Sequence, residues 1–244
     1  NKALELCTVV SYRSAAGESA FAATRAFCQK MCEHPLSAGG PVYGGNNWYY
    51  AYGKSSTQEI LGDAARVAAW AEGLASRPFM VIDDGWQVGK SPNSAVAKGS
   101  FKNIWDNPDY WKPDPEKYPR GLHPVVELGR ELGVEICLWF NPSVQDGYAD
   151  WEKDAQALVG LYDEYGIRTF KIDGLAIPDK RSESNLRRLF DRVLERTGGQ
   201  VVFNLDATAG RRGGYHMFNE YGNIFLENRY TDWQNYYPYW TLRN

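Results

Sequence analysis

The chain has 244 residues, of which 43% are hydrophobic and 23% charged, and its formal net charge at pH 7 is −3. This length suits one large domain, and the composition excludes a disordered, collagen-like or coiled-coil chain. The slightly acidic balance argues against a nucleic-acid binder, and no apolar run approaches the roughly 20 residues that a membrane-spanning helix needs.

The N-terminal part is expected to form a connector. A helix is expected from about 18 to 33. Its apolar face would be formed by Phe21, Phe27, Cys28 and Met31. A stretch rich in Gly and Pro at 36–45 then gives the one plausible boundary. We therefore divide the chain into a helical connector at 1–38 and a main domain at 39–244.

Beyond this boundary, short apolar runs alternate with amphipathic helices. The expected strands lie near 43–50 and at 79–82, 134–140, 167–172, 201–205 and 224–226. One of the helices opens with the capping box Ser56-Thr57-Gln58-Glu59. Six such βα units predict an α/β fold with a parallel sheet, either open or closed into a barrel. The first strand lacks a following Gly-x-Gly-x-x-Gly motif, which disfavours the dinucleotide-binding form.

Every expected strand ends in a polar or aromatic cluster. The clusters are Asn46-Asn47-Trp48, Asp83-Asp84-Gly85-Trp86, Trp139-Phe140-Asn141-Pro142, Lys171-Ile172-Asp173-Gly174, Asn204-Leu205-Asp206 and residues 227–233. An ordinary turn explains any single Asp-Gly pair. Four or five carboxylate-bearing strand ends around one sheet are costly unless a site uses them, and in such folds the site lies at this end.

One strand allows a more specific prediction. Because residues two apart share a face, Phe170 and Ile172 would face the helices while Lys171 and Asp173 point inward. A lysine beside Asp173 would keep this carboxylate ionised, as a nucleophile requires. A structural ion pair is the alternative.

Paired acids with surrounding aromatic residues suit cleavage of a glycosidic bond. Trp48, Trp86, Trp139 and Trp233 would stack on the apolar faces of the sugar, with core packing as the alternative for each. The cysteines are expected to be ordinary buried thiols. The histidines form no metal-binding pattern, and neither a metal nor an organic cofactor is implied.

Three motifs occur in a fixed order along the chain. They are Asp83-Asp84-Gly85-Trp86, Lys171-Ile172-Asp173-Gly174, and Arg229-Tyr230-Thr231-Asp232 followed by Tyr236-Tyr237-Pro238. In order and approximate spacing, the chain from about 41 to 244 resembles the α-galactosidases of glycoside hydrolase clan D, families 27 and 36, and most of all the family 36-like branch. The resemblance implies a (β/α)₈ TIM barrel and a retaining, double-displacement mechanism.

The resemblance also implies roles for single residues. Asp173 matches the nucleophile, Lys171 a lysine that contacts the sugar, and Asp232 the acid/base. Glu227 would take the acid/base role if the register shifts. The further expected substrate-binding residues are Asp83 and Asp84, on the galactose 4- and 6-hydroxyls, and Trp48, Trp86, Trp139, Asn141, Asp206 and Arg229.

The chain departs from the family in three places. Gly45 stands where a ligand-facing tryptophan is usual, which would leave a wider subsite. Residues 206–214 differ from the usual Ser-Cys-Ser-Gly-Gly-Gly, and an inserted arginine there would suit an acidic or decorated glycan. Two of the eight βα units are missing. We therefore expect an excised piece of a longer enzyme that carries other domains.

Three functions are compatible with these residues. The first is hydrolysis of terminal α-galactosyl residues from oligosaccharides. The second is galactosyl transfer to another sugar, as in raffinose synthase-like relatives, and the third is sugar binding without catalysis. In each case the partner is an oligosaccharide or glycoside, with no nucleic acid and no membrane insertion.

Overall fold

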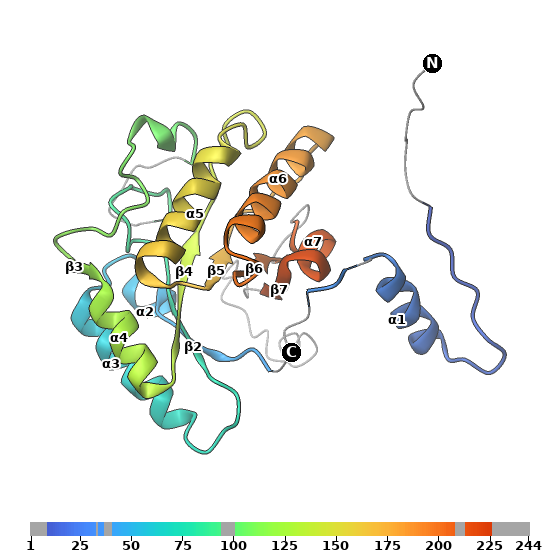
Figure 1. The fold of residues 1–244 in the computed structure, drawn as a ribbon, viewed down its shortest axis with the longest axis horizontal. Coiled ribbons are helices and arrows are strands. Elements are labelled where there is room, and N and C mark those ends of the chain that lie inside the picture. The colour runs from blue at the N-terminus through green and yellow to red at the C-terminus, as the bar shows by residue number, and fades with distance from the viewer. Residues whose placement is uncertain (1–8, 33, 37–40, 94–100, 208–212, 226–244) are drawn as a thin grey trace, which may run out of the picture.

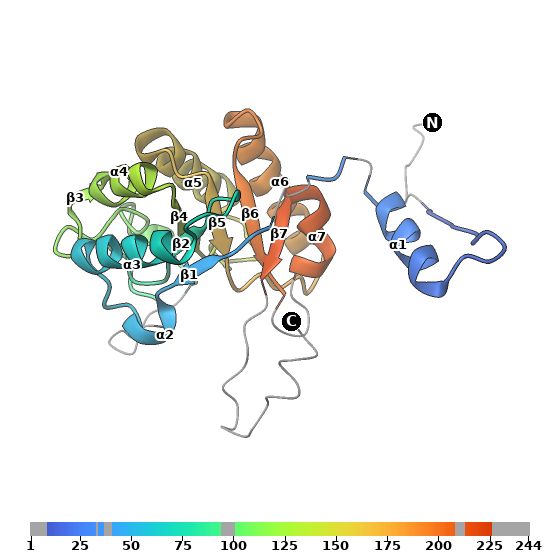
Figure 2. The ribbon, with the colours of Figure 1, turned by 90° about the horizontal axis from the view of Figure 1, so that it is seen from below.

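The computed structural model describes residues 9–32, 34–36, 41–93, 101–207 and 213–225. Within them, six parallel strands form one sheet in the order β1-β2-β4-β5-β6-β7. The strands are β1 (Gly44–Asn46), β2 (Phe79–Ile82), β4 (Glu135–Phe140), β5 (Thr169–Ile172), β6 (Val202–Asp206) and β7 (Gly222–Phe225). The sheet curls into a half-barrel, which confirms the expected parallel α/β fold (Figure 2).

Helices alternate with the strands along the chain. They are α2 (Trp48–Ala51), α3 (Thr57–Trp70), α4 (His123–Leu132), α5 (Trp151–Tyr165), α6 (Lys180–Arg196) and α7 (Gly214–Tyr221), with a short 3₁₀ helix at Ile104–Asp106. Helix α3 packs beside α4 and α5 beside α6, on the convex side of the sheet (Figure 1). A further short strand, β3 (Pro119–Leu122), lies outside the six-stranded sheet.

The helix ends follow local sequence signals. Helices α4 and α5 stop at Gly133 and Gly166, each with φ of 72°, a left-handed conformation that glycine adopts without strain. Asp179 caps the start of helix α6, and its carboxylate accepts the Ser182 N–H at 2.8 Å. At the start of α3, the Ser56 hydroxyl instead donates to the Glu59 carboxylate at 3.1 Å, so the reciprocal backbone bonds of the expected capping box do not form.

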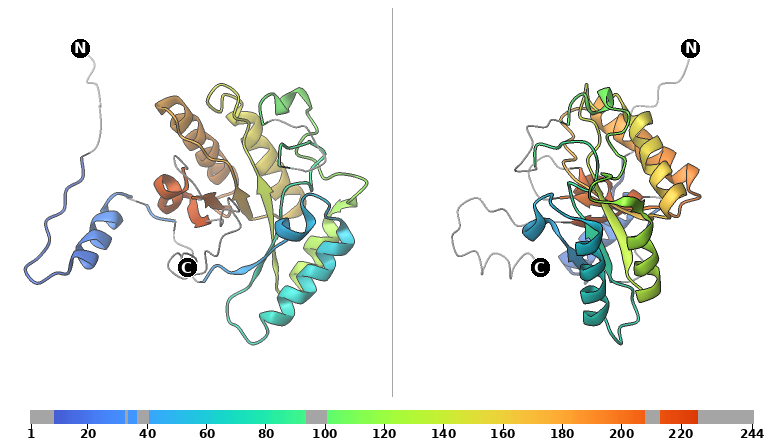
Figure 3. Two further views of the ribbon diagram at one scale, coloured as in Figure 1. Left: turned by 180° about the vertical axis from the view of Figure 1, so that it is seen from behind. Right: turned by 90° about the vertical axis from the view of Figure 1, so that its left-hand side faces the viewer.

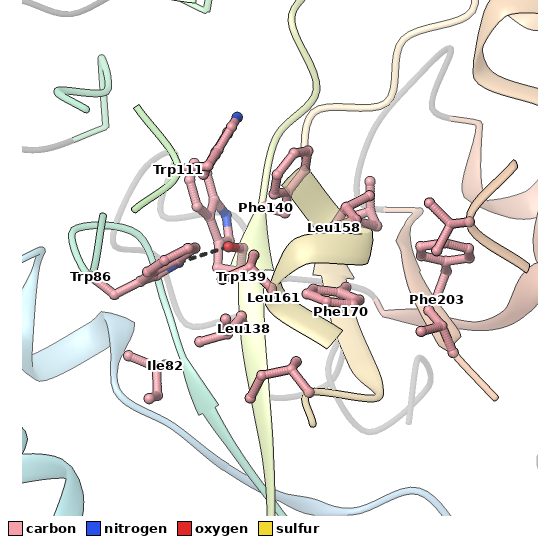
Figure 4. Close-up of a cluster of buried hydrophobic side chains, with 14 of the residues drawn as sticks. Ile82, Trp86, Trp111, Leu138, Trp139, Phe140, Leu158, Leu161, Phe170 and Phe203 are labelled. Atoms are coloured by element: carbon pink, nitrogen blue, oxygen red, sulfur yellow. Dashed lines mark hydrogen bonds between the residues drawn. The ribbon is translucent and has the colours of Figure 1, made fainter. Parts of the chain in front are cut away.

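The hydrophobic core lies between the sheet and its helices. Phe170 and Ile172 of β5 are completely buried on this side, as the strand periodicity predicts. Leu138 and Phe140 of β4 and Phe203 of β6 fill the same layer (Figure 4). The opposite, concave face of the sheet carries the polar residues of β5 and β6, because side chains alternate along each strand.

Several elements differ from the sequence prediction, among them strand β3 and the 3₁₀ helix, which were not predicted. The opening strand is shorter than expected, since residues 48–51 form α2. Helix α7 was not predicted. The N-terminal helix α1 (Ala20–Lys30) forms, but none of its residues is buried: Phe21 is 78% exposed. Helix α1 stands apart from the sheet in every view, and its expected apolar face is no more than half-buried, at Phe27 and Cys28 (Figure 3).

No helix in the described ranges combines the length and the apolar character needed to cross a lipid bilayer.

The burial of β5 and the exposure of α1 can be tested by replacing one phenylalanine in each. Phe170→Ala is expected to lower the free energy of unfolding by about 3–5 kcal/mol, because it leaves a cavity in a close-packed core. The matched variant Phe21→Ala removes the same atoms from an exposed position and is expected to change stability by less than about 0.5 kcal/mol. Urea unfolding of the two variants measures the difference, and equal losses would contradict the placement of α1.

Candidate functional site

Polar side chains gather at the carboxyl ends of five strands. Asn46 and Asp206 are the last residues of β1 and β6. Asp83, Asn141 and Asp173 directly follow β2, β4 and β5. Because parallel strands end at the same edge of a sheet, the fold brings these side chains close together. Asn46 and Asp83 belong to one hydrogen-bonded group and Asp173 and Asp206 to a second, with Asn141 beside the second.

The first group is centred on Asp83. Its Oδ2 accepts hydrogen bonds from Asn46 Nδ2 at 2.7 Å and from Lys171 Nζ at 2.8 Å. Its Oδ1 accepts the backbone N–H of Asp84 at 2.9 Å. Both side chains of the Lys171–Asp83 ion pair are only 4% exposed. Sequence reasoning paired Lys171 with Asp173 and did not anticipate this contact.

The second group is centred on Asp173. Its Oδ2 accepts the indole N–H of Trp139 at 3.1 Å, and its Oδ1 accepts the backbone N–H of Gly174 at 2.6 Å. The same Gly174 N–H lies 3.3 Å from Oδ2 of Asp206, so the two carboxylates are close neighbours. The Asp173 side chain is half-buried. A carboxylate that is both held by donors and partly accessible can contact a ligand.

Asp84 holds the loop that follows β2. Its carboxylate accepts the Gln87 side-chain N–H at 2.7 Å and the Ser91 hydroxyl. The pKa of Asp84 is raised overall, because the effect of burial exceeds the lowering by the hydrogen bonds from Ser91 and Gln87. The structure therefore gives Asp84 a role in fixing this loop, and its contact with a sugar hydroxyl stays a prediction.

Asn141 lies against the residue that follows Asp173. It is buried, and its Oδ1 has no hydrogen-bond partner in the described part of the chain. A Cβ atom on Gly174 would come within 2.3 Å of Asn141 Nδ2, and Gly174 has φ of 67°. Only glycine fits at position 174 without strain, and this close approach keeps Asn141 beside the second group.

The four expected tryptophans have different environments. Trp86 and Trp139 are completely buried, and the Trp86 indole N–H donates to the Trp139 carbonyl oxygen at 2.8 Å (Figure 4). Their burial favours core packing over stacking on a sugar. Trp48 is partly exposed and contacts Tyr52 edge to face, with ring centroids 5.5 Å apart. Trp233 lies outside the described residues.

The expected wider subsite at Gly45 is not supported. A Cβ atom built on Gly45 would lie 3.0 Å from Val67 Cγ2 of α3 and 3.2 Å from Met80 Sδ. A side chain at this position would therefore point toward the helices and not toward the strand-end site. It is the neighbouring Asn46 that turns inward, since its amide donates to Asp83.

Sequence reasoning missed Asp154, a buried acid on α5. Its Oδ2 accepts the Ser143 backbone N–H at 2.9 Å, and its Oδ1 accepts the Trp105 indole N–H at 3.0 Å. It thereby joins the loop after β4 to the segment around the 3₁₀ helix. Burial raises its pKa to about 8 despite these two donors. In the sequence it resembles any acid in the first turn of a helix, so only the fold identifies it.

Several predicted residues lie outside the described part of the chain. They are Asp232, Arg229, Glu227 and most of the 206–214 segment. Cys28, Cys32 and Cys137 are free thiols, and Cys7 is among the residues not described. No group of three His, Cys, Asp or Glu side chains in the described ranges could hold a metal ion.

Comparisons with known proteins find similarity to α-galactosidases. An alignment over 99 residues, covering 41% of the chain, shows 33% identity to an α-galactosidase of Escherichia coli. A gapped alignment over 152 positions, covering 55% of the chain, shows 28% identity to α-galactosidase C of Emericella nidulans. These stretches span only 12% and 18% of the two relatives. No family model matches the chain.

A similar fold occurs in a family 36 α-galactosidase of Geobacillus stearothermophilus, solved in complex with raffinose. The two structures superpose with a TM-score of 0.55 and 18% identity over 78% of this chain and 31% of that one. The resemblance to α-galactosidases that the three motifs indicate is thus confirmed, in sequence and in fold, for a part of those proteins.

The buried ion pair can be tested against a surface pair. Lys171→Met leaves the Asp83 carboxylate buried without its cation and is expected to cost about 3–5 kcal/mol of stability. Lys153→Met removes the partner of Asp150 from an exposed pair, with Lys153 56% exposed, and is expected to cost less than about 1 kcal/mol. Urea midpoints compare the two, and similar losses would contradict the importance of the Lys171–Asp83 pair.

Asp154 predicts a pH dependence of stability. Its raised pKa means that the folded chain keeps this carboxyl protonated where the unfolded chain releases the proton. Its contribution is therefore fully present below about pH 4 and is lost as the pH rises toward about 8. Asp154→Asn is expected to flatten this part of the stability profile, measured by urea unfolding at several pH values. An unchanged slope would show that Asp154 is ionised in the folded chain.

Proposed function

We propose that this chain is the catalytic part of a retaining, exo-acting α-glycosidase that removes terminal α-galactosyl residues from oligosaccharides. Two findings support the proposal: the similarity to α-galactosidases and the half-barrel with carboxylates at its strand ends. The observation that carries it is Asp173, an accessible carboxylate at a strand end with both oxygens held by donors. Residues 1–38 would then be a connector to other domains of the whole protein.

In this proposal Asp173 attacks the anomeric carbon. Its N–H donors keep the carboxylate in one orientation, which lowers the entropy cost of reaching the attack geometry. A covalent glycosyl-enzyme forms while an acid protonates the leaving oxygen, and the same group then activates the water that releases the sugar. Asp232 is the proposed acid/base, with Glu227 as its alternative.

Substrate hydroxyls would be bound by the surrounding polar groups. Asp83 already accepts three hydrogen bonds, so it would offer a sugar hydroxyl its remaining acceptor site. Lys171 lies beside it as its ion-pair partner. Asp206 and Asn141 lie near Gly174, the residue after Asp173, and Asn141 contributes a carbonyl oxygen that has no partner among the described residues. Neither a metal nor an organic cofactor is part of this proposal.

Replacing the nucleophile tests the function. In the whole protein that carries this chain, Asp173→Asn is expected to lower kcat on an aryl α-galactoside by about 1,000-fold or more, because an amide does not form the glycosyl-enzyme. The matched variant Asp163→Asn, at an exposed position of α5, is expected to keep wild-type activity. Circular dichroism checks that both variants remain folded.

The assay also separates the related functions. Wild-type protein that releases galactose from the aryl galactoside is a hydrolase, and galactosylated sucrose formed with added sucrose identifies a transferase. Near-normal turnover by Asp173→Asn would contradict the nucleophile assignment. Glycan binding by the wild type with no turnover of any kind would contradict catalysis altogether.

A further inference from the structure

We propose that Trp139 is a positioning residue for Asp173, holding its carboxylate in the orientation that attacks the sugar. This proposal rests on the function proposed above, in which Asp173 is the nucleophile. It differs from the stacking role that the sequence suggests for this tryptophan. The contact that carries it is the hydrogen bond from Trp139 Nε1 to Asp173 Oδ2, at 3.1 Å.

The surroundings of Trp139 hold its indole N–H in a fixed position. The residue belongs to β4 and pairs in register with Lys171 of β5, two residues before Asp173. Its ring is completely buried and packs against Trp111 and Phe101, with centroid distances of 5.9 and 5.8 Å. Its own carbonyl oxygen accepts the Trp86 indole N–H (Figure 4). The donor is therefore pre-organised by packing, as an effective site requires.

The hydrogen bond from Trp139 also offsets the repulsion between the carboxylates of Asp173 and Asp206. Asp206 shares the Gly174 N–H with Asp173, so a second carboxylate lies close to the nucleophile. A like charge at short range disfavours the ionised form of a carboxylate, whereas a donated hydrogen bond favours it. Trp139 would thus help Asp173 to remain ionised and ready to attack.

Burial separates positioning from stacking. A completely buried ring offers no face to a sugar. Trp139 could stack on a sugar, and so affect substrate affinity, only if its ring moved out of the core. Loss of a donor to the nucleophile acts on the chemical step. Positioning therefore predicts a lower kcat at nearly constant KM, and stacking predicts a higher KM.

The aromatic cluster supplies a matched control. Trp111 is also buried and stacks on Phe140, with ring centroids 4.0 Å apart. Its indole nitrogen has no hydrogen-bond partner in the described part of the chain. Trp139→Phe and Trp111→Phe thus remove the same indole N–H and the same volume from one cluster, but only the first removes a donor to Asp173.

The kinetic experiment uses the whole protein and an aryl α-galactoside. Trp139→Phe is expected to lower kcat by about 10- to 100-fold with KM within about two-fold of wild type. The acidic limb of its pH profile for kcat/KM is expected to move to higher pH. Trp111→Phe keeps the Trp139 donor and an aromatic ring beside it, so it is expected to change kcat by less than about three-fold and to leave the acidic limb in place. Equal behaviour of the two variants, or a raised KM with unchanged kcat in Trp139→Phe, would overturn the proposal.

A second measurement needs no turnover. The Trp139 indole N–H signal of ¹⁵N-labelled wild-type protein is expected to shift as the pH is lowered through the ionisation of Asp173, and this shift is expected to vanish in Asp173→Asn. A signal that shifts neither with pH nor with the Asp173→Asn substitution would overturn the proposal. This test does not depend on whether Trp139→Phe folds. A titrating signal in a protein that does not cleave the galactoside would support the contact and contradict only the proposed function.

Discussion

The contacts of Lys171 set the geometry on which the rest of the structure depends. This lysine lies on β5, yet its Nζ bonds Asp83 beyond β2 and lies 4.7 Å from the ring centroid of Phe225 in β7. Phe225 is in a strand two positions away in the sheet and Asp83 directly follows another, and neighbouring strands are about 4.8 Å apart. One side chain reaches both because the sheet curls around it, so these contacts of the buried charge depend on the half-barrel.

A buried charge is costly, and the surroundings of the ion pair offset that cost. Asp83 receives hydrogen bonds from Asn46 and from the backbone of Asp84, in addition to the lysine. Such a pair contributes little net stability compared with apolar packing, but it does fix which side chains meet. The neighbouring Asp173 is held in the same way, by an indole and a backbone N–H. Two carboxylates are thus oriented by rigid strand ends before any ligand arrives.

The sequence predicts the framework well because the framework is governed by short-range patterns. Apolar runs separated by amphipathic helices identify all six parallel strands, and glycine marks the end of α5. Apart from the short helices α2 and α7, which sequence reasoning missed, the errors concern longer-range relations. Amphipathicity shows that α1 has an apolar side but does not show what covers it. Likewise, the motif around Gly45 suggests a missing ligand contact, whereas the phase of the short strand β1 directs that position toward Val67.

What the sequence determined by itself is the identity of the strands, the residues at their ends and the resemblance to α-galactosidases. These follow from local periodicity and from motifs that are contiguous along the chain. Only the tertiary structure decided the partners: Lys171 with Asp83, Trp139 with Asp173, and Asp154 beneath the loop after β4. The partners in each of these contacts come from different elements of the fold, so their contact depends on the curl of the sheet and the packing of its helices, which no local pattern encodes.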